Sequence, residues 1–215
     1  MILSALCVQA DWVSVSVDEV IPDGNSVGIV STIDLRDAGL NPSLASIEVA
    51  LHISDVPGDL DYANGGDFYA YLTSGNGGFA VLLNRIGKTE ANSVGSDVNG
   101  FDVGFSLTGS DIHTLDGSAA LDDEGRLTGE WGADGRYVDP YLVVDTDSRT
   151  AGFDSFVGID PNTEWTLFLA DVSTGGFAQL DSWAINIAII PEPTSIGMMG
   201  LVVALALLIR RRFLS

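Results

Sequence analysis

The chain has 215 residues, of which 46% are hydrophobic, so one domain with a packed core is possible and a second full domain is not. The net charge of -21 disfavours nucleic acids as partners, because it repels their phosphate backbones, and makes cations more suitable. Cys7 is the single cysteine, which excludes an intramolecular disulfide and leaves packing, with or without a metal ion, to stabilise the fold.

The first ten residues have features of the end of a signal peptide. An apolar run from Ile2 to Val8 is followed by Val8-Gln9-Ala10, a small-x-small pattern that export peptidases accept, and then by Asp11, the first acidic residue. No positively charged region precedes this run. We therefore predict that residues 1–10 are a signal-peptide remnant, with a buried first strand as the alternative.

Residues 11–190 have the pattern of an all-β domain. Short runs rich in Val, Ile, Thr, Phe and Tyr are separated by clusters of Gly, Asp, Asn and Ser, and helical periodicity is scarce before residue 195. The runs expected to form strands are residues 11–21, 27–35, 44–54, 66–74, 78–87, 100–109, 163–172 and 181–190. This number of short strands predicts an antiparallel β-sandwich or jelly roll.

No convergent catalytic group is evident in the sequence. Residues 24–28 satisfy the nucleophile-elbow pattern G-x-S-x-G, but the residues after them form a β-run where an elbow needs a helix. His52 and His113 are each explained most simply as strand or loop residues. We therefore predict that the protein is not an enzyme.

Acidic, glycine-rich loops are a candidate calcium site. Asp59, Asp61 and Asp67 share the stretch SDVPGDLDYANGGD, and Asp97 and Asp102 lie in SDVNGFD. Calcium accepts irregular coordination by six to eight oxygen ligands, which such loops can supply, although neither stretch has the EF-hand spacing. A solvated acidic surface is the alternative explanation.

Aromatic residues have two possible roles. Trp165 and Trp183 lie in strands with apolar alternation and are predicted to be in the core. Other rings could form a sugar-stacking face, because aromatic rings pack on the apolar faces of sugars, although ordinary β-packing is the simpler explanation. These other rings are Tyr62, Tyr69, Tyr71, Trp131 and Tyr137.

The end of the chain differs from the rest. Residues 196–209 are an unbroken run of apolar residues, serine-free and interrupted only by glycine, and three arginines follow. About 14 residues at roughly 1.5 Å each span only about 21 Å of a bilayer core that is about 30 Å thick. The run nevertheless lacks the polar face of a soluble helix, and the arginines supply a positive-inside stop. We predict a single hydrophobic transmembrane helix at about residues 195–209, with a buried helix as the alternative.

The tail resembles the PEP-CTERM sorting signal of bacterial exosortase substrates in three features, which occur in the expected order: Pro191-Glu192-Pro193, the apolar segment, and Arg210-Arg211-Arg212. The resemblance implies export, transient retention in the inner membrane by residues 191–215, and processing by an exosortase near the Pro-Glu-Pro motif. It also implies delivery to the cell surface or extracellular matrix of an exopolysaccharide-producing Gram-negative bacterium. The two prolines fix their φ angles and predict a stiff, exposed joint.

The body resembles the P domain of proprotein convertases. DPNTEWTLFLAD at residues 160–171 and LDSWAINI at residues 180–187 are similar to the closing strands of that family, and GDFYAYLTS at residues 66–74 is similar to an earlier strand. The resemblance covers roughly residues 20–187 and implies a β-sandwich that often carries calcium. Two departures are the turn at residues 74–78 and Glu164, where a small residue is usual. No subtilisin-like protease domain precedes this body, so the proteolysis of the family is not implied.

Together these features predict an exported, non-enzymatic protein of the cell envelope or extracellular matrix, which acts as a structural or binding module. Its expected partners are an exosortase, the inner membrane, and exopolysaccharide or other matrix components, and calcium is its candidate cofactor. The alternative is an accessory or carbohydrate-binding module of a secreted hydrolase.

Overall fold

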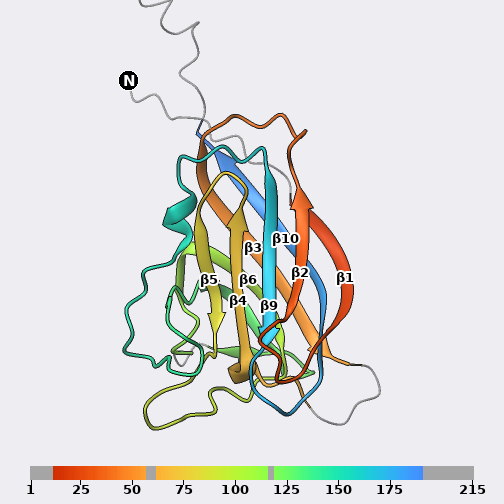
Figure 1. Cartoon of the computed structure of the whole chain (residues 1–215), viewed down its shortest axis with the longest axis vertical. Coiled ribbons are helices and arrows are strands. Elements are labelled where there is room, and N and C mark those ends of the chain that lie inside the picture. The colour runs from red at the N-terminus through yellow and green to blue at the C-terminus, as the bar shows by residue number, and fades with distance from the viewer. Residues whose placement is uncertain (1–11, 57–61, 116–118, 191–215) are drawn as a thin grey trace, which may run out of the picture.

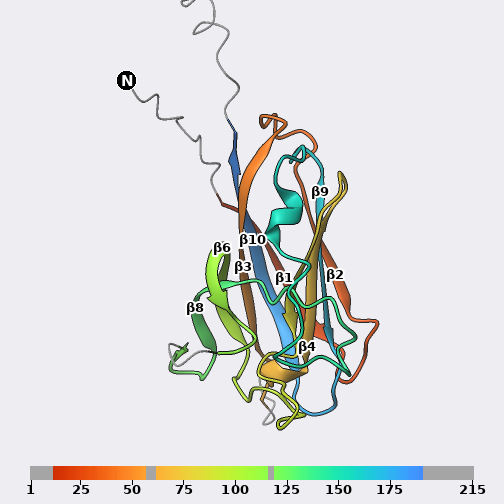
Figure 2. The same ribbon diagram turned by 90° about the vertical axis from the view of Figure 1, so that its left-hand side faces the viewer.

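The structure, a computed structural model, describes residues 12–56, 62–115 and 119–190. Two β-sheets pack face to face, and Figure 2 shows them edge-on as two layers. The six-stranded sheet has the order β1-β10-β3-β6-β8-β7, and the four-stranded sheet has the order β2-β9-β4-β5 (Figure 1). The elements are β1 (Val13–Ile21), β2 (Ile29–Asp34), β3 (Leu44–Asp55), η1 (Gly65–Asp67), β4 (Phe68–Ser74), β5 (Phe79–Asn84), β6 (Phe101–Asp111), β7 (Ala120–Leu121), β8 (Leu127–Gly132), η2 (Phe153–Phe156), β9 (Glu164–Asp171) and β10 (Ala178–Ile189).

The described residues form strands and two short 3-10 helices but no α-helix, which confirms the all-β prediction. β4 shows how the sequence produces a two-faced strand. Phe68, Ala70 and Leu72 are fully buried, whereas Tyr69 and Tyr71 between them are only half-buried. Successive side chains of a strand point to opposite faces, so the first set fills the core and the second lies on the outer face of the sheet.

Trp165 of β9 and Trp183 of β10 are 0% and 1% exposed, which confirms that both are core residues. The two strands belong to different sheets, so the rings fill the space between the layers. Trp183 Nε1 donates a hydrogen bond to Ser31 Oγ on β2 at 2.8 Å, and Trp165 Nε1 donates one to the Pro161 carbonyl at 3.2 Å. Each buried indole therefore has the polar partner that its N–H group needs.

One part of the fold differs from the purely antiparallel arrangement that the sequence predicts. β8 pairs with β6 in parallel, whereas the other strand pairs of the described residues are antiparallel. The reason lies in the strand order. β7 lies at the edge of the sheet, with one strand position between it and β6. β8 occupies this position, antiparallel to β7 and parallel to β6. β7 and β8 are not among the predicted strands, because β7 has two residues and β8 contains Gly129 and Gly132.

The described chain begins and ends on neighbouring strands. β1 pairs antiparallel with β10, so the start of β1 and the end of β10 lie at the same end of the molecule, drawn at the top of Figure 1. The predicted signal-peptide remnant (residues 1–10) and the predicted sorting segment with its transmembrane helix (residues 191–215) lie outside the described residues. Within residues 12–56, 62–115 and 119–190, no helix is long and apolar enough to cross a membrane.

Candidate functional site: an aromatic face on the four-stranded sheet

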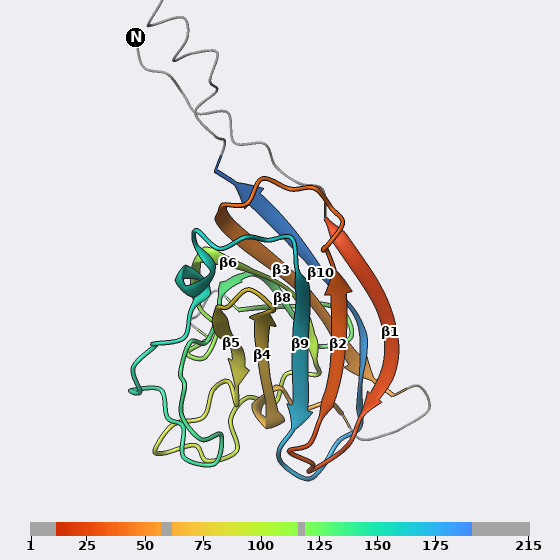
Figure 3. The ribbon, with the colours of Figure 1, turned by 45° about the horizontal axis from the view of Figure 1, so that its top comes forward.

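Five aromatic side chains form a connected group at the outer surface of the four-stranded sheet. We call them the aromatic face: Tyr69, Tyr71, Tyr137, Phe79 and Phe168. Four of them stand on β4, β5 and β9 and are half-buried. The fifth comes from the loop between β8 and η2. Figure 3 shows the strands that carry the first four, side by side in the order β5, β4, β9.

Strand register sets the contacts within the aromatic face. Tyr71 lies opposite Phe168 across the β4–β9 pair, and their rings stack with centroids 4.7 Å apart and planes 14° from parallel. Tyr71 also contacts Phe79 at 5.2 Å, and Tyr69 lies 6.0 Å from Tyr71 and 6.3 Å from Phe168. On the other side of Phe168, Val30 of β2 continues the same row and is 59% exposed. The group therefore extends across the sheet from β2 to β5, where Phe79 lies opposite Thr73 and contacts Tyr71 diagonally.

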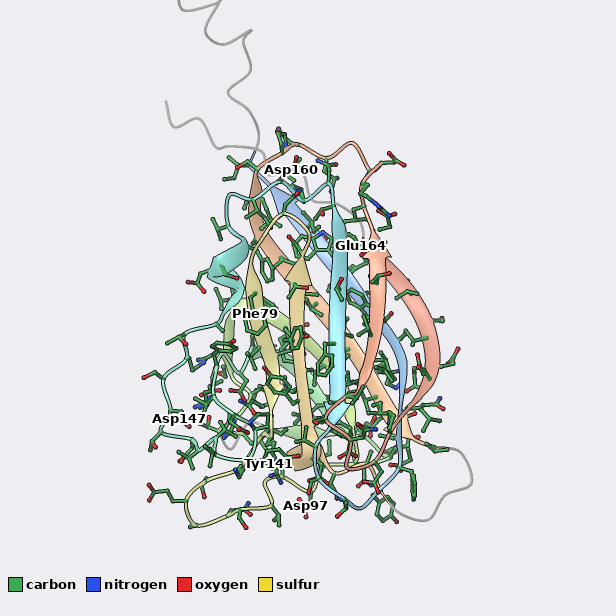
Figure 4. All side chains as sticks on the ribbon, viewed as in Figure 1. Phe79, Asp97, Tyr141, Asp147, Asp160 and Glu164 are labelled. Atoms are coloured by element: carbon green, nitrogen blue, oxygen red, sulfur yellow. The ribbon has the colours of Figure 1, made fainter. Side chains whose placement is uncertain are left out.

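The neighbouring row on this outer face contains three threonines and ends with Phe79 on β5. Register places Thr32 of β2, Thr166 of β9 and Thr73 of β4 side by side. Charged side chains follow in the next row, where Asp34 lies opposite Glu164. The rings and the threonines thus form an uncharged surface, and Figure 4 shows Phe79 on this near sheet and Glu164 towards its upper end.

Tyr137 reaches the aromatic face from outside the sheet. Its ring meets Phe79 edge to face, with centroids 5.2 Å apart and planes at 72°, and the residue is 68% exposed. Asn84, at the end of β5, holds the backbone on both sides of Tyr137, because its Nδ2 donates to the Arg136 carbonyl and to the Val138 carbonyl, each at 2.9 Å. Asn84 is fully buried. The buried Asn84 side chain is therefore a clamp: its two hydrogen bonds fix the backbone that carries the exposed Tyr137 ring.

Arg136, which precedes Tyr137, also belongs to a buried network of charged side chains. Its Nη2 forms an ion pair with Asp111 Oδ2 at 2.8 Å, and its Nη1 lies 3.3 Å from Asp134 Oδ1. Asp134 Oδ2 in turn contacts His113 Nδ1 at 2.7 Å, and both of these side chains are 0% exposed. Arg136 Nη2 also donates to the Asp145 carbonyl at 2.8 Å. The network fixes the loop that carries Tyr137 to the strands beneath it.

His113 has both ring nitrogens occupied. Nδ1 contacts Asp134, and Nε2 lies 2.9 Å from the Lys88 carbonyl oxygen. Burial lowers the pKa of His113, but the hydrogen bond and the negative charge of Asp134 outweigh burial and raise the pKa above its ordinary value. Both partners are acceptors, so the protonated form of the ring can donate from both nitrogens and connect Asp134 to the Lys88 backbone. His113 lies in a turn after β6, which agrees with the prediction of a strand or loop residue.

A second polar region lies around Asp67, at the loops near the lower end of β4 in Figure 1. A cavity of about 290 Å³ is lined in part by Asn64, Asp67, Asp97 and Ser173. Burial raises the pKa of Asp67, and its hydrogen bond from Ser173 and the charge of Arg85 offset this only in part. The Arg85 guanidinium lies 3.7 Å from the Asp67 carboxylate.

Asp171, at the end of β9, is buried beside this cavity. Burial above all, together with the negative charges of Asp67 and Asp23, raises the pKa of Asp171 to about 7, against hydrogen bonds from the Ser173 and Gly24 backbone N–H groups. Around Asp67 and Asp171, burial therefore favours the protonated carboxyl groups, and Arg85 offsets this at Asp67 only in part.

The structure brings together only part of the predicted calcium ligands. Asp67 and Asp97 line the same cavity, while Asp59 and Asp61 lie outside the described residues. Asp102 belongs to β6 of the other sheet. Among the residues that the structure describes, no group of three or more His, Cys, Asp or Glu side chains could hold a metal ion. Calcium binding therefore stays a prediction from the sequence.

The predicted sugar-stacking residues divide into two groups. Tyr69, Tyr71 and Tyr137 belong to the aromatic face, whereas Trp131 is 3% exposed on β8 of the other sheet and Tyr62 is 61% exposed beside the loop that precedes β10. The prediction did not include Phe79 and Phe168. For Phe168 the signal was present, since it alternates with the buried Trp165, Leu167 and Leu169 and must face outwards.

Comparison with known proteins gives few matches. No protein-family model and no curated protein matches the chain. A chain in the crystal structure of the Aeromonas sobria serine protease with its chaperone is 14% identical, with a TM-score of 0.45, over 86% of this chain and 27% of that chain. The serine protease of Aeromonas sobria is 15% identical, with a TM-score of 0.44, over 85% of this chain and 27% of its own. Similarities with such low sequence identity and TM-score do not indicate the fold or the activity of this chain.

Proposed function

We propose that the chain is an exported, non-enzymatic protein of the cell envelope or extracellular matrix that binds its partner through the aromatic face. The observation that carries this proposal is the connected group of five rings at the outer surface of a rigid sheet, with Tyr137 held 68% exposed. Contiguous apolar surface on a protein is a usual mark of an interaction site. Four of the rings stand on strands, and hydrogen bonds from Asn84 hold the backbone beside Tyr137, so the surface is formed before a partner arrives.

The sorting part of the proposal rests on the sequence. Pro191-Glu192-Pro193, the apolar segment and the three arginines support export, retention in the inner membrane and processing by an exosortase. The described chain ends just after β10, whose last residue, Ile189, lies at the upper end of the molecule in Figure 1. The likeness to a P domain and a jelly-roll connection of the strands belong to the same proposal.

Calcium is part of this proposal as a cofactor of the loops near Asp67. The raised pKa values of Asp67 and Asp171 support it, because burial favours the protonated form of each carboxyl, and a bound cation would stabilise the charged form. The second candidate function is an accessory or carbohydrate-binding module of a secreted hydrolase. The aromatic face favours that function equally, and the sorting tail distinguishes the two.

The sorting proposal is tested by expression of the full chain in a bacterium that contains an exosortase. We expect the intact chain in the membrane fraction, followed by a form shortened near Pro193 at the cell surface or in the medium. A strain without the exosortase should retain the intact chain in the membrane. Replacement of Arg210, Arg211 and Arg212 by serine should weaken retention. Recovery of the intact chain only from the cytosol would contradict the proposal.

A further inference from the structure

We propose that the aromatic face binds an uncharged polysaccharide and that Tyr137 is a pre-positioned contact ring of this site. The inference deepens the function proposed above and rests on it, because an exported protein is needed for contact with such polymers. Nothing in the inference depends on how the tail is processed.

The first step is the position of Tyr137. An aromatic ring gains most stability when it is buried, yet this ring is 68% exposed while the backbone on both sides of it is fixed by Asn84. Asn84 Oδ1 is buried without a hydrogen-bond partner among the described residues, and such an unpaired acceptor destabilises the fold. The hydrogen bonds of Asn84 thus hold Tyr137 in an exposed position, although the unpaired Oδ1 atom of Asn84 lowers the stability of the fold. Fixing a contact residue in advance lowers the entropy lost on binding.

The second step is the chemistry of the surface. Aromatic rings offer apolar area that can pack on the C–H faces of sugar rings, and the adjacent threonines and tyrosine hydroxyls can exchange hydrogen bonds with sugar hydroxyls. Burial, followed by the neighbouring Tyr137 and Tyr71, raises the pKa of Tyr69 to about 12, so its phenol stays protonated and can donate. The group from Val30 to Phe79 crosses four strands, which at a spacing of about 4.8 Å extends over about 15 Å. This extent suits a chain of sugars better than a single sugar.

The third step is charge. The described outer face between Val30 and Phe79 presents rings and hydroxyl groups, whereas the whole chain carries a net charge of -21. That field repels anionic polymers, including nucleic acids and uronate-rich polysaccharides, and it equally opposes pairing of two copies of the chain. A cationic partner would find its attraction elsewhere on the surface, because the aromatic face offers it no carboxylate. An uncharged polysaccharide fits both the neutral face and the acidic surroundings.

The inference is tested by native gel electrophoresis of the purified full chain in detergent, with hydroxyethyl cellulose, galactomannan or dextran in the gel and with alginate as the anionic comparison. We expect at least one neutral polymer to retard the chain and alginate not to do so. Tyr137→Ala should weaken the retardation about tenfold, the effect expected for one aromatic contact, and Tyr137→Phe should retain most of it. Because Tyr137 is 68% exposed, its loss should leave the melting temperature nearly unchanged.

Tyr62→Ala is the matched control, because Tyr62 is 61% exposed and does not belong to the aromatic face. It should bind as the unchanged chain does. The inference is overturned if none of the three neutral polymers retards the chain, if alginate is preferred, or if Tyr137→Ala and Tyr62→Ala behave alike. A self-association that Tyr137→Ala abolishes would also overturn it, in favour of a second copy as the occupant. Cell fractionation distinguishes the two proposals. If Tyr137→Ala is sorted normally but no longer binds the neutral polymer, both proposals are supported. If the unchanged chain is sorted normally but binds no neutral polymer, only the polysaccharide proposal is overturned.

Discussion

Asp171 is a single residue through which the acidic composition affects the stability of the fold. The residue is 3% exposed, and burial above all, together with the negative charges of Asp67 and Asp23, raises its pKa to about 7. A folded-state pKa above the value of 3.8 for an ordinary aspartate means that the folded chain holds this proton more tightly than the unfolded chain does. The contribution of Asp171 to stability is therefore fully present below about pH 4 and is lost as the pH rises to about 7.

The prediction that follows concerns Asp171→Asn. The unchanged chain should lose stability between about pH 4 and about pH 7, by up to a few kcal/mol, since each unit of pKa difference corresponds to about 1.4 kcal/mol. Asp171→Asn should flatten this dependence, because the amide does not titrate. Urea unfolding at several pH values measures the effect. Asp37→Asn, at an exposed turn position, removes the same charge and should keep the original slope. Equal slopes for the two variants would show that Asp171 is not responsible.

β10 is an interior strand of the six-stranded sheet and supplies several buried side chains to the core. It pairs with β1 on one side and with β3 on the other, and its inward side chains include Leu180, Trp183, Ile185 and Ile187. The Trp183 ring also reaches the other sheet through its hydrogen bond to Ser31. A large side chain at this position therefore connects the two layers directly.

Trp183→Ala should cost roughly 3 to 5 kcal/mol of unfolding free energy, because it removes a fully buried ring and leaves Ser31 without its donor. Urea denaturation followed by circular dichroism measures this loss. Trp12→Ala is a suitable comparison, since Trp12 is 48% exposed and its removal should change the stability little. Similar midpoints for the two variants would mean that Trp183 does not support the core.

The sequence allowed most strands to be predicted, because alternation and glycine-rich turns are local signals. The eight predicted runs correspond to β1 to β6, β9 and β10, whereas β7 and β8 have too few apolar residues to give such a signal. The aromatic face was predicted only in part. Its assembly depends on the register of β4 with β9 and on the contact of Asn84 with the chain beside Tyr137, which is far away in the sequence. The partner of His113 was equally beyond local patterns, because Asp134 lies on another segment.

The charge of the whole molecule is unbalanced at its surface. Within the described residues, every basic side chain makes a hydrogen bond or ion pair inside the chain, and none remains to neutralise the other carboxylates. These side chains are Arg36, Arg85, Lys88, Arg126, Arg136 and Arg149. The remaining acidic groups repel one another, so cations from solution should stabilise the folded state.

Calcium should raise the melting temperature of the chain more than magnesium does at equal ionic strength. A cation bound only by the folded state adds RT ln(1 + [Ca]/Kd), about 2.7 kcal/mol at a hundredfold excess over Kd, and magnesium dehydrates too reluctantly to replace calcium in an irregular site. Asp59→Asn combined with Asp61→Asn should remove the calcium-specific part and leave the general salt effect. Equal responses to the two cations would identify the acidic residues as a solvated surface.

The position of β10 between β1 and β3 also determines how the molecule bears a mechanical load. A pull on the chain beyond Ile190 enters at the end of β10 and acts along the axis of that strand. The cross-strand hydrogen bonds on both sides lie perpendicular to this direction, so they are sheared together and are not peeled apart one after another. If the chain is tethered at this point while a ligand is held on the other sheet, the force acts along β10. Its pairings with β1 and β3 then resist that force in shear.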